Sequence, residues 1–143
     1  MPIRIVIADD HAIFRSGLRM LLEKDPGFAV VGEASTGPET LSVVASELPD
    51  VVILDLALPE LPGARVAEAL VTRHPEVAIV VLTMHEDEHY LRDLLRIGAS
   101  GFVLKRSTSS DLVQAIRAVQ RGERYVDPSL AGDLISQQVG RSP

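Results

Sequence analysis

Ile-Arg-Ile-Val-Ile-Ala-Asp-Asp, residues 3–10, is an apolar run that ends abruptly on two carboxylates. Three further apolar runs each end on one polar residue: residues 51–54 on Asp55, 78–82 on Thr83 and 102–104 on Lys105. Short continuous runs of Val, Ile and Leu are typical of strands buried on both faces, as in parallel sheets. Because the carboxyl ends of parallel strands share one edge of a sheet, we expect these polar groups to meet in one crevice. Such a set can bind a divalent cation and handle a phosphoryl group.

The rest of the chain alternates strand-like runs with amphipathic segments at the spacing of βαβ units. We predict strands near residues 3–8, 28–33, 51–55, 78–83 and 101–104, and helices near residues 12–24, 38–47, 64–74, 87–97 and 109–121. Pro38 suits the first turn of the second helix, and Gly122 lies just past the end of the fifth. The alternation predicts a parallel sheet that is covered by helices on both faces.

The composition bounds the class of protein. The chain of 143 residues is long enough for one domain with a substantial core. Hydrophobic residues make up 46% of the chain but aromatic residues only 3%, so the core must be aliphatic. No apolar run approaches the ~20 residues of a membrane span, and no signal peptide is visible. The lack of cysteine excludes disulfides and fits a cytoplasmic location. A net charge of −6 argues against direct binding of nucleic acid by this chain.

Four motifs in order carry a resemblance to a known family: Asp9-Asp10, Asp55 followed by Leu-Ala-Leu-Pro and Gly63, Leu82-Thr83, and Gly98-Ala-Ser-Gly-Phe-Val-Leu-Lys105. Over roughly residues 3–125 the chain resembles the receiver domain of a two-component response regulator of the NarL/FixJ (LuxR-type) subfamily. The resemblance implies a flavodoxin-like, doubly wound α/β fold with five parallel strands in the order 2-1-3-4-5. Full-length members of this subfamily resemble one another in carrying a C-terminal helix-turn-helix.

The resemblance also implies a role for each residue of the site. Asp55 would accept a phosphoryl group from the phosphohistidine of a sensor histidine kinase. Asp9, Asp10, Asp55 and the backbone carbonyl of Ala57 would hold Mg²⁺, and Lys105 would contact a phosphate oxygen. The three carboxylates and the lysine leave a negative charge that one divalent cation neutralises. We expect the protein to catalyse its own phosphorylation and slow dephosphorylation, and not to turn over a separate substrate.

Thr83 and Phe102 would form the switch, in which the hydroxyl binds the new phosphate and the aromatic ring turns inward. Each of these residues also has a purely structural interpretation. A Thr is common at the end of a strand, and Phe102 is equally well explained as a core residue. Taken alone, Asp10 is also of a type that caps helices.

Some positions depart from the widespread family pattern. Arg106 follows the lysine where that pattern has Pro, a variation that is usual in this subfamily. Ala57 and His85 occupy positions that by resemblance tune dephosphorylation, and Ala57 offers no polar group for that purpose. His85 is equally explained as a solvated loop residue. Three other histidines lack ligand spacing with any His or Cys and are interpreted as surface residues: His11, His74 and His89.

Residues 126–143 read as a separate element, because Asp127-Pro128-Ser129 fits a helix start and a polar stretch closes the chain. We interpret residues 1–125 as the receiver domain, and residues 126–143 as an extra C-terminal helix that begins a truncated linker to a missing DNA-binding domain. On this interpretation the protein regulates transcription and contacts DNA only through that domain. The alternative is a stand-alone receiver that acts as a phosphorelay shuttle or protein-binding switch.

Other classes fit the motifs less well. Haloacid-dehalogenase-like phosphatases resemble one another in carrying an Asp-x-Asp pattern at the end of the first strand, whereas here the two acids are adjacent. A nucleotide-binding domain would need a Gly-rich loop after the first strand or a Walker pattern, and neither is present.

We further expect phosphorylation to change the face formed by the fourth and fifth helices. The resemblance also suggests that a receiver face, often involving the first and fifth helices, pairs two protomers, and we expect phosphorylation to favour such a two-fold symmetric homodimer. The fifth helix is apolar over a broad arc, which either contributes to that interface or only covers the sheet: Leu112, Val113, Ile116 and Val119.

Overall fold

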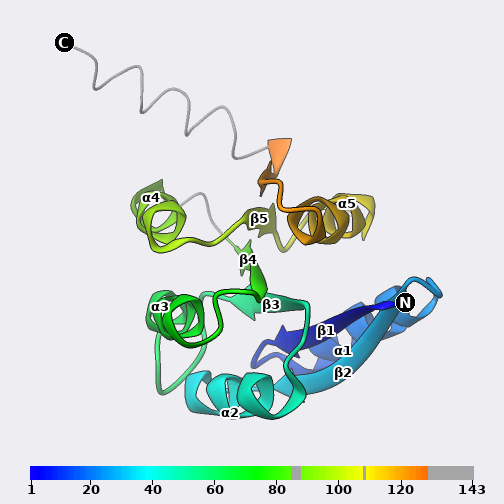
Figure 1. Cartoon of the computed structure of the whole chain (residues 1–143), viewed down its shortest axis with the longest axis horizontal. Coiled ribbons are helices and arrows are strands. Elements are labelled where there is room, and N and C mark those ends of the chain that lie inside the picture. Colours follow the sequence, from blue (N-terminus) through cyan, green and yellow to red (C-terminus); the bar gives the residue numbers. More distant parts are fainter. Residues whose placement is uncertain (85–87, 108, 129–143) are drawn as a thin grey trace.

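The computed structural model describes residues 1–84, 88–107 and 109–128 of the chain. Its centre is a parallel sheet of six strands in the order β2-β1-β3-β4-β5-β6 (Figure 1). The strands are β1 (Ile3–Ala8), β2 (Phe28–Ala34), β3 (Val51–Asp55), β4 (Ala78–Thr83), β5 (Gly101–Leu104) and β6 (Tyr125–Val126). The helices are α1 (Ala12–Glu23), α2 (Gly37–Glu47), α3 (Gly63–Arg73), α4 (Glu88–Ile97) and α5 (Ser109–Gln120). Each of the five strands and five helices expected over residues 3–121 is present, and no end differs from its predicted position by more than one residue.

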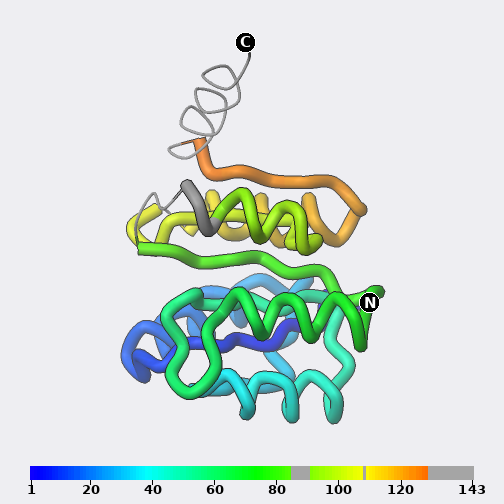
Figure 2. Tube along the Cα trace, turned by 90° about the vertical axis from the view of Figure 1, so that its left-hand side faces the viewer, coloured from blue at the N-terminus to red at the C-terminus, as the bar shows by residue number. Residues whose placement is uncertain are grey.

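The helices form a layer on each side of the sheet. One aliphatic core packs α2, α3 and α4 against one face of the strands, and a second packs α1 and α5 against the other. Figure 1 shows these two layers, and Figure 2 shows the molecule from the side of α2, α3 and α4. β3 is buried over its whole length because both cores use its side chains, which explains why its sequence shows no alternation. The doubly wound fold expected from the sequence is confirmed.

The sixth strand corrects the expected number of strands. β6 is only two residues long and pairs with β5 through Gly101 with Tyr125 and Phe102 with Val126. A strand this short carries no hydrophobic period, so the sequence pattern gave no sign of it. It crosses the boundary that we placed between residues 125 and 126. The helix expected after residue 126 lies almost wholly outside the described residues.

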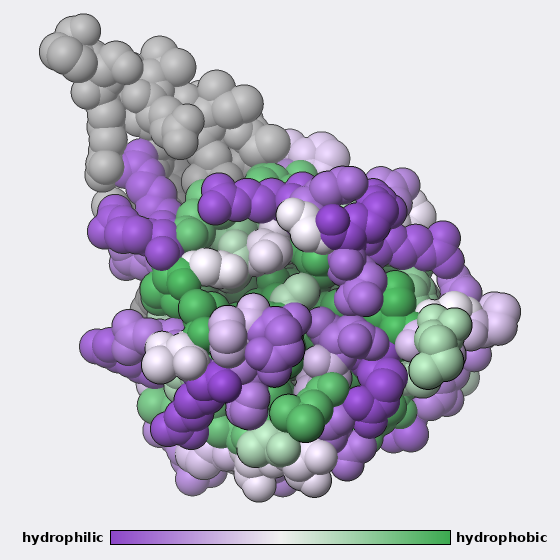
Figure 3. All heavy atoms as spheres, viewed as in Figure 1, coloured by the Kyte–Doolittle hydropathy of each residue, from purple (hydrophilic) through white to green (hydrophobic). Residues whose placement is uncertain are grey.

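The surface is mixed in character. Figure 3 shows hydrophilic side chains over much of one face, with smaller hydrophobic areas between them. Among the described residues, the large hydrophobic side chains that are exposed are Met1, Ile13, Met20, Leu48 and Met84. None of the helices in the described part of the chain has the length and apolar character needed to cross a membrane.

Candidate functional site

The polar residues that end the apolar runs lie together at one edge of the sheet. Asp9 follows β1, Asp55 ends β3, Thr83 ends β4, and Lys105 follows β5. Asp9, Asp55 and Thr83 are buried, and only 9% of the Lys105 side chain is exposed. The strands adjoin one another as β1-β3-β4-β5, which is why residues far apart in the chain meet here. The structure therefore brings together the groups that the sequence analysis selected.

Lys105 is the positive centre of the site. Its ammonium lies 2.8 Å from Asp9 Oδ2 and donates a hydrogen bond of 3.1 Å to Asp55 Oδ2. The same ammonium lies 4.7 Å from the centroid of the Phe14 ring of α1. Burial acts to lower the pKa of Lys105, but the two carboxylates outweigh it and raise the pKa above its ordinary value. The lysine therefore keeps its charge and partly neutralises two buried carboxylates.

Asp9 has one oxygen that is satisfied and one that is not. Its Oδ1 accepts a hydrogen bond of 2.8 Å from the backbone N–H of His11, which fixes the turn into α1. Its Oδ2 is buried and accepts no hydrogen bond of good geometry from the described residues, although the Lys105 ammonium is in ionic contact with it. Buried oxygens of this kind normally have a partner. Asp9 Oδ2 is therefore suited to an additional cationic ligand.

His11 belongs to the same cluster, which the sequence analysis missed. Its side chain is 59% exposed, as expected for a surface residue, but its Nδ1 lies 3.2 Å from Asp9 Oδ1 and 3.3 Å from Asp10 Oδ1. One donor atom each from Asp9, Asp10, His11 and Asp55 lies within 4.8 Å of the others. Spacing between histidines and cysteines does not reveal this contact, because the neighbours of the imidazole are carboxylates.

This donor set fits a divalent cation. Three carboxylates supply the hard oxygen ligands that Mg²⁺ and Ca²⁺ prefer, and the buried oxygen of Asp9 lacks a full hydrogen-bond complement. Asp10 is exposed and lies on the solvent side of the cluster, where waters can complete a coordination shell. The cluster is therefore a candidate metal site.

The loop after β3 holds Asp55 in place. Asp55 Oδ1 accepts a hydrogen bond of 3.0 Å from the backbone N–H of Ala57. The backbone of Leu56 is tied on both sides, because its N–H donates to the carbonyl of Leu82 and its carbonyl accepts from Gly63. A Cβ on Gly63 would lie 2.6 Å from Leu56 Cα and 3.0 Å from the Asp55 carbonyl oxygen. Only glycine allows the start of α3 to approach this loop so closely.

The two expected switch residues lie on neighbouring strands behind the site. Thr83 is 6% exposed, and its carbonyl accepts a hydrogen bond of 2.9 Å from the backbone N–H of Lys105. Phe102 is fully buried in the core beneath α3 and α4, so in this structure its ring points inward. Movement of these residues stays a prediction. His85 lies outside the described residues.

Charged side chains of α1 form a network that contacts the end of β1 and Glu33 on β2. Arg15 Nη1 donates a hydrogen bond of 2.5 Å to the carbonyl of Asp9, and Arg15 Nε donates one of 2.9 Å to Glu33 on β2. Arg19 also donates to Glu33. Burial acts to raise the pKa of Glu33, but the hydrogen bonds from Arg19 and Arg15 outweigh it and hold the pKa below its ordinary value.

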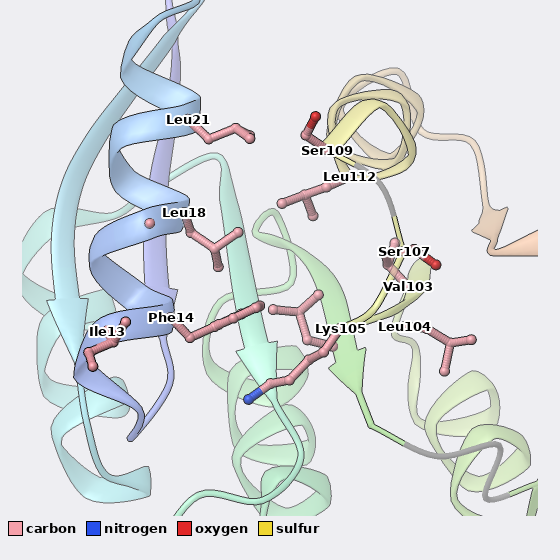
Figure 4. A pocket seen from close by; sticks show the side chains of 12 residues that line it. Ile13, Phe14, Leu18, Leu21, Val103, Leu104, Lys105, Ser107, Ser109 and Leu112 are labelled. Atoms are coloured by element: carbon pink, nitrogen blue, oxygen red, sulfur yellow. The ribbon is translucent and has the colours of Figure 1, made fainter.

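A pocket of about 340 Å³ opens beside the site, between α1 and α5. Figure 4 shows Phe14, Leu18 and Leu21 of α1 facing Leu112 of α5 across it, with the stem of Lys105 between the two helices. The floor is formed by the ends of β4 and β5. The pocket places an apolar surface directly next to the charged cluster.

Comparisons with known proteins agree with this arrangement. The family model of the response regulator receiver domain matches residues 5–117. The chain is 39% identical over 140 residues to the oxygen regulatory protein NreC of Staphylococcus carnosus, and the match covers 97% of this chain and 64% of NreC. The chain thus spans less than two thirds of the length of this curated relative.

Solved structures give the same result. A two-component response regulator of the LuxR family from Aurantimonas sp. SI85-9A1 is 35% identical, with a TM-score of 0.92, and the match covers 97% of this chain and 99% of that one. RcsB from Salmonella enterica serovar Typhimurium, bound to a promoter in the presence of the phosphomimetic BeF3⁻, is 29% identical with a TM-score of 0.89; the match covers 100% of this chain and 73% of that one. With its sheet order, its acidic cluster and these matches, the chain belongs to the response regulator receiver domain family, within the NarL/FixJ (LuxR-type) subfamily.

Proposed function

We propose that this receiver accepts a phosphoryl group on Asp55 from the phosphohistidine of a sensor histidine kinase. The observation that carries the proposal is the placement of Asp55 beside a charged lysine and a second, incompletely satisfied carboxylate at the sheet edge. A carboxylate oxygen of Asp55 attacks phosphorus, the P–N bond to the imidazole breaks, and the imidazole leaves with the bonding pair and takes up a proton. No other residue needs to become covalently modified.

Asp9, Asp10, Asp55 and the backbone carbonyl of Ala57 would hold Mg²⁺. The ion would supply positive charge that lets an anionic phosphoryl group approach the carboxylates. Lys105 contributes the remaining charge, because its ammonium can exchange its contact with Asp55 Oδ2 for one with a phosphate oxygen. Positioning and neutralisation of charge are the main tasks of the protein in phosphoryl transfer. With the same groups the chain would catalyse its own phosphorylation and slow dephosphorylation.

The response to phosphorylation would pass through Thr83 and Phe102. Thr83 ends β4 at the edge of the sheet that carries the site, and the hydrogen bond from the backbone N–H of Lys105 to its carbonyl ties β4 to β5. Phe102 lies on β5 three residues before Lys105 and packs in the core next to α4. A small shift at the strand ends can therefore reach the surface formed by α4 and α5.

We propose that the whole protein is a transcription regulator in which residues 1–125 are the receiver and residues 126–143 lead to a LuxR-type DNA-binding domain. The greater length of the curated relatives and the solved complex of RcsB with a promoter support this proposal. The phosphorylated protein would act as a homodimer, since two-fold symmetry suits a domain that reads paired half-sites.

The decisive experiment is incubation with acetyl phosphate in the presence and absence of Mg²⁺, followed by intact-mass measurement. We expect a gain of one phosphoryl group that depends on Mg²⁺ and is lost in Asp55→Asn. Peptide mapping that placed the group on Ser107, Ser109 or Ser110 instead would overturn the assignment. Retention of full labelling in the Asp9→Ala, Asp10→Ala double variant would rule out the proposed metal site.

A further inference from the structure

Asp127 is a buried charged residue that the chemistry of the site does not use. It follows β6 directly and is 1% exposed, while its neighbour Pro128 is exposed. A carboxylate is rarely buried unless several donors surround it, because it loses its hydration. Asp127 also fits the predicted helix start, because Pro128, which follows it, is helical. Its burial calls for another explanation.

Three hydrogen bonds connect Asp127 to β5 and to the loop that follows it. Its backbone N–H donates a hydrogen bond of 2.7 Å to the carbonyl of Phe102. Its carboxylate Oδ2 accepts a hydrogen bond of 3.0 Å from the backbone N–H of Leu104 and another from the hydroxyl of Ser107. One residue thus binds both ends of the stretch 102–107, which carries Lys105 in its middle.

These bonds extend the sheet past the point where the backbone of β6 ends. The last pair between β5 and β6 joins Phe102 to Val126, so the next outward-facing N–H, that of Leu104, has no strand carbonyl opposite it. The Asp127 carboxylate takes that place. On the side of β5 that faces β4, the backbone N–H of Lys105 donates a hydrogen bond to the carbonyl of Thr83. The two peptide units that flank Leu104 are therefore held from opposite sides, Val103–Leu104 by Asp127 and Leu104–Lys105 by Thr83.

We infer that Asp127 is a positioning residue for Lys105 and the point at which the state of the site is transmitted to the residues after 128. This inference rests on the proposed function of the site. When Lys105 exchanges a carboxylate for a phosphate oxygen, the loop 104–107 adjusts, and the bonds to Asp127 adjust with it. Because coupling between two parts of a protein is reciprocal, a partner that binds beyond residue 128 also biases the position of Lys105.

Two variants of Asp127 distinguish the effect of its hydrogen bonds from the effect of its charge and size. Asp127→Ala removes the acceptor, whereas Asp127→Asn keeps an oxygen for the Leu104 N–H and loses the charge. Val44→Ala is the matched control for stability, because Val44 is fully buried on α2, a helix that packs against β1, β2 and α3. Tyr125→Phe is the local control, because it removes a contact of β6 with Asp111 and leaves the carboxylate of Asp127 in place.

The first measurement needs no phosphate. Amide hydrogen exchange followed by NMR should show faster exchange at Leu104 and Lys105 in Asp127→Ala by about tenfold or more, the effect of one lost hydrogen bond to a charged acceptor. Asp127→Asn should show a smaller change, and Val44→Ala and Tyr125→Phe should leave these two amides no faster than the rest of β5. Equal acceleration in Asp127→Ala and Val44→Ala would overturn the positioning role.

The second measurement uses acetyl phosphate and beryllofluoride as probes. We expect the rate of labelling to fall about tenfold in Asp127→Ala, to fall less in Asp127→Asn and to stay unchanged in Val44→Ala. Beryllofluoride should alter hydrogen exchange in peptides from residues 128–143 of the unmodified chain, and this response should vanish in Asp127→Ala. Persistence of the response would overturn the transmission role. If the unmodified chain takes up neither probe, the proposed function fails, and the exchange at Leu104 alone decides the link to Asp127.

Discussion

The Lys105 ammonium lies 3.1 Å from Asp55 Oδ2, and 50 positions in the chain separate the two residues. The contact joins the end of β3 to the end of β5 across β4. Only 2% of the Asp55 side chain and 9% of the Lys105 side chain are exposed, so water screens the pair weakly. Two consequences follow, one for the stability of the chain and one for its response to metal.

Lys105→Met should destabilise the metal-free chain, because it leaves the carboxylates of Asp9 and Asp55 buried without their cation while it keeps the apolar stem beside Phe14. We expect the free energy of unfolding to fall by about 1–3 kcal/mol in urea denaturation at pH 7. Lys105→Arg keeps the positive charge, so its free energy of unfolding should fall less. Mg²⁺ should reduce the difference in the free energy of unfolding between Lys105→Met and the unmodified chain. An unchanged free energy of unfolding would mean that the ion pair only balances its own desolvation.

Asp10→Asn should have the opposite effect on the metal-free chain. Asp10 adds a third carboxylate to a cluster in which one ammonium already serves two, so removal of its charge relieves repulsion. We expect the melting temperature without divalent cations to rise and the further rise on addition of Mg²⁺ to shrink. Differential scanning calorimetry with EDTA and with excess Mg²⁺ measures both. Asp93→Asn, on α4 and away from the cluster, is the control and should respond to Mg²⁺ like the unmodified chain.

The sequence predicted the sheet well because most of its strands are continuous aliphatic runs, which are typical of strands buried on both faces. It also predicted which polar residues meet, since parallel strands share an edge. Three features escaped it for physical reasons. β6 is too short to show a period, and His11 binds carboxylates and not other histidines. Asp127 fits the predicted helix start, but its bonds to Leu104 and Ser107 join residues 23 and 20 positions apart, which no local pattern shows.

The apolar arc of α5 can form part of an interface or can only cover the sheet, and the burial of its side chains distinguishes the two. Leu112, Ile116 and Val119 are at most 4% exposed and belong to the core with α1. Only Val113 is partly exposed. Most of this arc therefore covers the sheet. Exposed apolar surface on this side of the molecule comes instead from α1, where Ile13 is 91% and Met20 67% exposed.

Gly63→Ala should disturb the loop that carries Asp55, because the added Cβ would meet backbone atoms that cannot move aside alone. We expect a loss of about 1–3 kcal/mol in the free energy of unfolding and slower labelling by acetyl phosphate. Gly17→Ala is the matched comparison, since a Cβ on Gly17 would have no atom within 4 Å. It should stabilise α1 by about 0.5–1 kcal/mol. If both variants changed stability in the same direction, the close approach of α3 to the loop would not matter.

The network around Glu33 should make stability depend on pH in the acid range. The folded state holds the pKa of Glu33 below its ordinary value, so the stabilisation is fully present above the unfolded pKa of about 4.3 and is lost as the pH falls through the folded pKa. Glu33→Gln should therefore cost about 0.5–1.5 kcal/mol at pH 7 and progressively less as the pH falls through the folded pKa of Glu33. Glu23→Gln, which removes an exposed partner of Arg19, should cost less than about 0.5 kcal/mol at both pH values. Urea denaturation over this pH range compares them.

The exposed residues of α1 indicate which surface two copies of the chain would use to associate. Ile13, Gly17 and Met20 lie at spacings of four and three, so they share one face of the helix, and the glycine in the middle lets a second helix approach closely. Large exposed apolar side chains grouped in this way are typical of interaction surfaces. We expect sedimentation velocity to show a weak dimer that strengthens with beryllofluoride and Mg²⁺. Ile13→Ser and Met20→Ser should weaken it, whereas Leu48→Asn, at an exposed turn after α2, should not. A monomer in both states across the micromolar range would place dimerisation outside this chain, and the receiver would then act by masking or releasing the proposed DNA-binding domain.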